Sequence, residues 1–130
     1  SWEKYGIHAL ETVYPIVGPG FESVQNIGDK NRNIVHLHHS KGIDINIANI
    51  HDMLGGFGLI SLMGTKGGIQ IKSTDTYYAF KKQLQSYVNY LQTGYKPVPW
   101  NETYELMQLV SAGIESREKG GIKITLNKDN

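Results

Sequence analysis

The stretch IVHLHHSKGIDINIANI at residues 34–50 decides the fold class of this 130-residue chain. Apolar side chains recur at every second position on both sides of Ser40-Lys41-Gly42, and this is the period of a β-strand. The polar residues and the glycine between the two runs are typical of a tight turn. The stretch therefore predicts a hairpin of two antiparallel strands.

Shorter runs on both sides of the hairpin predict further strands. They cover residues 23–27, 58–63, 69–72 and 122–126, with residues 64–68 as the turn between the second and the third. Together with the hairpin, these runs predict a mainly antiparallel sheet of about five to six strands.

Three segments have apolar residues three and four positions apart, which is the spacing of a helix. The first covers residues 5–17 and should kink or stop within residues 15–20, where two prolines and two glycines lie. The second covers residues 77–91, with residues 73–75 offering N-cap oxygens and Gly94 as its C-terminal cap.

The third helix is expected to have Asn101 as the cap of its amino end and to be terminated by Gly120-Gly121. Its inward-facing residues should be Leu106, Met107, Val110 and Ile114. All elements together predict an α+β fold in a single domain over residues 1–130, with an open-faced sheet and helices packed on one face. The other face would expose alternating isoleucine and leucine, so we expect it to bind a second subunit and form a homo-oligomer.

Composition and charge exclude several classes of function. The 13 lysine and arginine residues are scattered and nearly balance the 12 acidic ones, so nucleic acid is not an expected partner. No apolar run approaches the roughly 20 residues that span a bilayer, so no membrane contact is expected. The sequence contains no address for a compartment, and among the possible locations the cytoplasm is favoured. The chain has no cysteine, which excludes disulfides, thiolate catalysis and cysteine-bound zinc. Its abrupt start at residues 1–4 suggests a cut through a longer protein.

Neither a cofactor-binding residue nor a metal site is predicted in the chain. Residues 56–61, Gly-Phe-Gly-Leu-Ile-Ser, begin like a dinucleotide-binding G-x-G-x-x-G sequence but end in serine and precede a strand instead of a helix. His36 and His38 share one strand face, where they could bind a metal weakly, while His39 points away. Further ligands would have to come from residues 51–52, so we interpret these histidines as ordinary strand residues.

His8 is a candidate for proton transfer. It follows Ile7 in the first predicted helix, with Lys4 four residues before it and Glu11 three residues after it on the same side. An imidazole, with an ordinary pKa of about 6.5, can take or give a proton near neutral pH. Spacing alone leaves open the alternative of a surface histidine that pairs casually with Glu11.

The sequence YGIHALE at residues 5–11, followed by Val17-Gly18, resembles the segment that opens the catalytic helix of the glucose-fructose oxidoreductase and inositol dehydrogenase family, also called Gfo/Idh/MocA. Later features agree in order and extend the resemblance over nearly the whole chain: Lys41-Gly42, Gly64-Thr65, Gly67, Tyr90-Leu91, Gly94, Pro97, Pro99, residues 102–109, Ser111-Ala112, Glu115-Ser116 and residues 121–126. Each motif is weak alone, but the ordered set is fairly specific.

The resemblance implies that this chain is the C-terminal substrate-binding and oligomerisation domain of a nicotinamide-dependent oxidoreductase. An N-terminal Rossmann domain, absent from this chain, would bind NAD or NADP, and this chain is not expected to be active without it. The reaction implied is hydride transfer to or from a sugar, a polyol or a similar alcohol.

The resemblance also implies roles for particular residues. His8 would be the catalytic residue, and Lys4, Tyr5 and Glu11 would contact the sugar-like substrate. The family often has an aspartate four residues before the histidine, and Lys4 stands there in this chain. A non-catalytic dimerisation or carbohydrate-binding module remains the alternative function.

Overall fold

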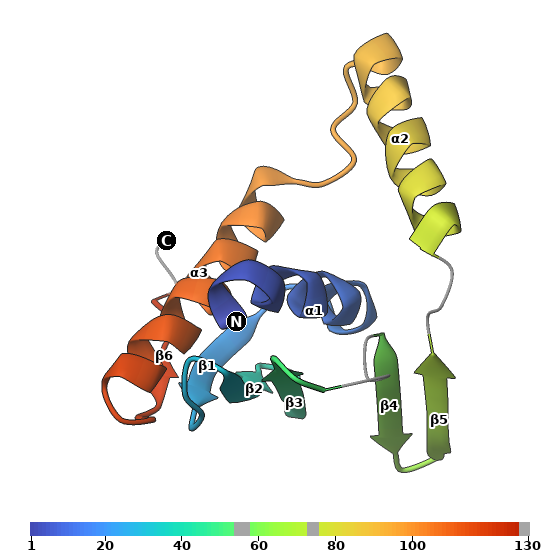
Figure 1. Ribbon diagram of the computed structural model, residues 1–130. Coiled ribbons are helices and arrows are strands. Elements are labelled where there is room, and N and C mark those ends of the chain that lie inside the picture. The colour runs from blue at the N-terminus through green and yellow to red at the C-terminus, as the bar shows by residue number, and fades with distance from the viewer. Residues whose placement is uncertain (54–57, 73–75, 128–130) are drawn as a thin grey trace. The chain divides into compact units, whose positions relative to one another are not determined.

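The computed structural model describes residues 1–53, 58–72 and 76–127. They form two compact units, shown in Figure 1. The first unit consists of Ser1–Asp52 and Trp100–Asn130, and the second of Met53–Pro99. Helices and antiparallel strands occur in both units, so the predicted α+β class is confirmed.

The first unit is a four-stranded antiparallel sheet with two helices on one face (Figure 1). The strands lie in the order β3-β2-β1-β6. Their bounds are Phe21–Asn26 for β1, Arg32–His39 for β2, Ile43–Ile50 for β3 and Ile124–Thr125 for β6. The helices are α1, Trp2–Val17, and α3, Trp100–Glu118. The predicted hairpin at residues 34–50 is confirmed, because β2 and β3 pair in antiparallel register on either side of a turn.

The core lies between this sheet and the two helices. Along β2 every second residue is fully buried, and Val35 and Leu37 are 0% exposed. The pairing register puts Ile47 of β3 beside Val35 and Val24 of β1 beside Leu37, so three strands contribute to one apolar face. This face packs against the buried sides of α1 and α3.

The opposite face of the sheet is more polar than predicted. Ile43, Ile45 and Ile47 are two residues apart and therefore share one face. They pair with buried residues of β2, so this is the helix-covered face, and the residues between them lie on the outer face. Near the turn between β2 and β3, the side chains on the outer face are His36, His38, Asp44 and Asn46. At the far end of this hairpin they include Ile34 and Ile50. The expectation of an open face of alternating isoleucine and leucine is therefore wrong. Homo-oligomer formation through this face stays a prediction.

Helix α1 ends where the sequence predicted but begins earlier. Gly18, with a φ of 77°, follows its last residue, and its N–H donates to the carbonyl of Tyr14 at 2.8 Å. The helix starts at Trp2 because this side chain is completely buried against Gly6 and Gly113, where no side chain occupies the space. The indole N–H of Trp2 donates to the Val110 carbonyl at 3.0 Å.

One predicted core position of α3 is wrong. Met107 is 55% exposed, whereas Leu109 is 0% exposed. The buried side of the helix consists of Leu106, Leu109, Ala112, Gly113 and Ser116, which are three or four residues apart. Met107 lies about 100° around the helix from Leu106 and so points to solvent. Val110 and Ile114 are partly buried at the edge of the core.

The second unit contains the hairpin of β4, Leu59–Gly64, and β5, Gly67–Lys72, and the helix α2, Thr76–Thr93. The helix ends as predicted at Gly94, whose N–H donates to the Tyr90 carbonyl at 2.8 Å. The N-cap predicted at residues 73–75 lies outside the described residues. Among the helices of the described part, none combines the length and apolar character needed to cross a membrane.

Candidate functional site

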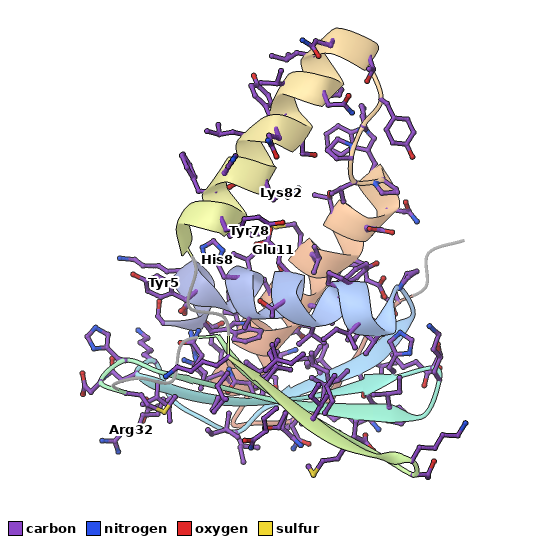
Figure 2. All side chains as sticks on the ribbon, turned by 90° about the vertical axis from the view of Figure 1, so that its right-hand side faces the viewer. Tyr5, His8, Glu11, Arg32, Tyr78 and Lys82 are labelled. Atoms are coloured by element: carbon purple, nitrogen blue, oxygen red, sulfur yellow. The ribbon has the colours of Figure 1, made fainter. Side chains whose placement is uncertain are left out.

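Helix α1 has a buried side and an exposed side, and the candidate residues lie on the exposed one. The buried side consists of Trp2, Gly6, Leu10, Tyr14 and Val17. At about 100° per residue, His8 lies diametrically opposite the middle of that buried set. Figure 2 shows His8 and Glu11 on the side of α1 that faces away from the sheet, and Tyr5 beside one end of the helix. Lys4 is also exposed, so all four residues implied by the resemblance are accessible.

His8 and Glu11 are in contact. The Nδ1 atom of His8 lies 3.3 Å from Oε2 of Glu11, and the two side chains are 57% and 56% exposed. The hydroxyl of Thr12 donates to the backbone carbonyl of His8 at 2.8 Å, so it points along the helix instead of toward the ring. This arrangement leaves one edge of the imidazole open to a ligand.

The C-terminal end of α1 is fixed by Glu105 of α3, a residue that the sequence did not single out. Its Oε2 accepts a hydrogen bond from the Tyr14 hydroxyl at 2.7 Å. Its Oε1 accepts from the N–H groups of Gly20 and Phe21 at 2.9 and 2.7 Å. Burial, and then the bond to Glu105, raise the pKa of Tyr14 well above its ordinary value. In the sequence, only the Gly-Pro-Gly turn indicates that an acceptor is needed here, because such a turn leaves backbone N–H groups without partners in a helix or a strand.

The N-terminal end of α1 is held by Arg117, near the other end of α3. Arg117 forms an ion pair with Glu3, and its side chain is only 6% exposed. The hydrogen bond from Arg117 is the largest cause that lowers the pKa of Glu3 to about 2. Arg117 also donates to Oδ1 of Asn33 at 3.1 Å, which ties the pair to the sheet. Both ends of α1 are thus attached to α3, and this fixes the direction in which His8 points.

The strand histidines divide between the two sheet faces as predicted. Nε2 of His36 and Nδ1 of His38 lie 3.1 and 2.9 Å from the same Oδ1 atom of Asp44. Hydrogen bonds from His38 and then His36 hold the pKa of Asp44 below its ordinary value. His39 is buried on the other face, where Nε2 lies 3.1 Å from the carbonyls of Gly18 and Pro19.

No metal or dinucleotide site can be assigned to the described residues. In residues 1–53, 58–72 and 76–127, no group of three or more histidine or acidic side chains could hold a metal ion. His51 pairs with its neighbour Asp52 at 2.8 Å. Of the glycine-rich sequence, residues 56 and 57 lie outside the described residues, and Gly58 leads directly into β4, not into a helix. No protein-family model, curated protein or solved structure matches the chain.

Proposed function

We propose that this chain is the C-terminal substrate-binding domain of a nicotinamide-dependent oxidoreductase that acts on a sugar, a polyol or a similar alcohol. The observation that carries the proposal is an exposed histidine, His8, on a helix fixed at both ends, with one ring nitrogen 3.3 Å from the carboxylate of Glu11. The resemblance to the Gfo/Idh/MocA family supplies the class of reaction.

NAD or NADP, when bound, supplies the group that accepts or gives the hydride. The resemblance implies a Rossmann domain outside this chain, and we assign the binding of the cofactor pyrophosphate to that domain. The residues of this chain would then act only on the alcohol.

The role proposed for His8 is to accept the proton of the alcohol. The hydroxyl of the substrate donates a hydrogen bond to Nε2 of His8. As the carbinol carbon loses hydride, the electron pair of the O–H bond forms the carbonyl and the proton moves to Nε2. The imidazolium then releases this proton to water, and the same steps in reverse reduce a carbonyl.

Lys4 and Tyr5 are the proposed substrate contacts. Both are exposed on the N-terminal side of His8, and Tyr5 is 54% exposed. The ammonium group of Lys4 donates hydrogen bonds, and the phenol of Tyr5 both donates and accepts them. Such a pair suits a ligand with several hydroxyl groups.

The test uses the full-length protein that contains this chain. NAD and NADP would each be supplied with a panel of sugars and polyols, and the absorbance of the reduced nicotinamide would be followed. His8→Ala should lower kcat on the order of 100-fold. His51→Ala is the matched control, since His51 is also an exposed histidine and has its own carboxylate partner.

Two results would overturn the proposal. One is a full-length protein that binds neither NAD nor NADP, and the other is a His8→Ala variant that retains the wild-type rate. Sugar binding without any turnover would favour the alternative of a carbohydrate-binding module.

A further inference from the structure

The two ring nitrogens of His8 are in different environments, and this difference assigns a role to Glu11. Nδ1 lies 3.3 Å from Oε2 of Glu11. An ionised carboxylate can only accept hydrogen bonds, so the proton of a neutral imidazole in this contact is on Nδ1. Nε2 then keeps its lone pair and is free to accept a proton.

We propose that Glu11 is a positioning residue that holds His8 in the Nδ1–H tautomer and does not itself contact the substrate. This inference rests on the proposed function, because it names which nitrogen of His8 receives the alcohol proton. It replaces the substrate contact that the resemblance implied for Glu11.

The neighbours of His8 on the exposed side of α1 cannot take this role. The ammonium group of Lys4 has donors only and cannot accept from an imidazole N–H. The hydroxyl of Thr12 is directed at the His8 carbonyl, 2.8 Å away. Glu11 is therefore the acceptor that the geometry assigns to Nδ1.

The strength of the contact follows from its exposure and its spacing. Residues three apart on a helix stay neighbours as long as the helix is intact, and α1 is fixed by Glu105 and Arg117. Both partners are more than half exposed, so we expect the contact to shift the tautomer equilibrium toward Nδ1–H by only about two-fold in the free protein. A substrate over the ring would exclude water and strengthen that preference.

The test measures the tautomer directly and the kinetics separately. In the full-length protein with isotope-labelled histidine, the NMR shifts of the two ring nitrogens report the tautomer of His8 at a pH where the ring is neutral. Glu11→Ala removes the acceptor at Nδ1, so it should move the shifts toward the Nε2–H form, and it should lower kcat by about two-fold or more with little change in KM for the alcohol. Glu115→Ala is the control, because it removes a comparable surface pair, that of Glu115 on α3 with Lys119.

Each outcome discriminates between the roles. Ring-nitrogen shifts that are the same in the wild type and in Glu11→Ala would overturn the positioning role. A raised KM with an unchanged kcat would also overturn it and would make Glu11 a substrate contact. If the shifts move but the wild-type protein oxidises no alcohol, the tautomer assignment stands and the proposed oxidoreductase function fails.

Discussion

Replacing Glu105 by alanine should destabilise the first unit by releasing the turn that follows α1. The carboxylate accepts three hydrogen bonds, from the Tyr14 hydroxyl and from the N–H groups of Gly20 and Phe21. Each donor that loses its acceptor costs about 1 kcal/mol where water can partly replace it, and all three bonds are partly buried. We therefore expect Glu105→Ala to lower the free energy of unfolding by about 3 kcal/mol.

Urea unfolding of the protein, followed by circular dichroism, measures this difference. Tyr14→Phe removes only one of the three bonds and should cost about 1 kcal/mol. Glu118→Ala is a matched control, because Glu118 is an exposed glutamate on the same helix. A Glu105→Ala variant no less stable than Tyr14→Phe would refute the idea that this carboxylate holds the turn after α1.

Two further outcomes test the packing and the ion pair of the first unit. Leu109→Ala should lower the free energy of unfolding by about 2–5 kcal/mol, because Leu109 is 0% exposed. Met107 is 55% exposed, so Met107→Ala should change this free energy by less than about 0.5 kcal/mol. Equal effects of the two variants in urea unfolding would contradict the assigned buried side of α3. Glu3 has a folded pKa of about 2 against an ordinary value of 4.5, so its pair with Arg117 stabilises the fold above about pH 4.5, and that contribution is lost as the pH falls toward 2. Glu3→Gln should reduce the dependence of the free energy of unfolding on pH between about 4.5 and 2. An unchanged dependence would mean that solvent screens the charge of Glu3, which is 40% exposed, and that the ion pair does not stabilise the fold.

Local patterns were enough to predict most of the secondary structure. The hairpin of β2 and β3 follows from the two-residue period at residues 34–50, and the ends of α1 and α2 follow from Gly18 and Gly94. These signals lie within a few residues of the feature that they determine. The same period also assigns one face to each side chain, so the polar outer face was implicit in the sequence, although the apolar residues were wrongly divided between the two faces.

The errors and omissions come from contacts between residues that are far apart in the sequence. Trp2 extends α1 because it packs against Gly113, and no local pattern around Trp2 indicates that partner. Met107 and Leu109 both fit a helical stripe, and only the position of α3 over β1 decides which of them is buried. The role of Glu105 likewise depends on a turn more than 80 residues earlier in the chain.

The same long-range contacts determine whether His8 can act as proposed. The sequence identifies His8 and Glu11 as neighbours on one helix, but it does not indicate where that helix points. The pair of Glu3 with Arg117 and the bond of Tyr14 with Glu105 attach the two ends of α1 to opposite ends of α3, with His8 between them. Because the imidazole must meet its alcohol within hydrogen-bonding distance, a small rotation of α1 would move Nε2 out of reach. Residues of α3 that do not contact the imidazole therefore help to orient it. The orientation of His8 thus depends on the stability of the first unit.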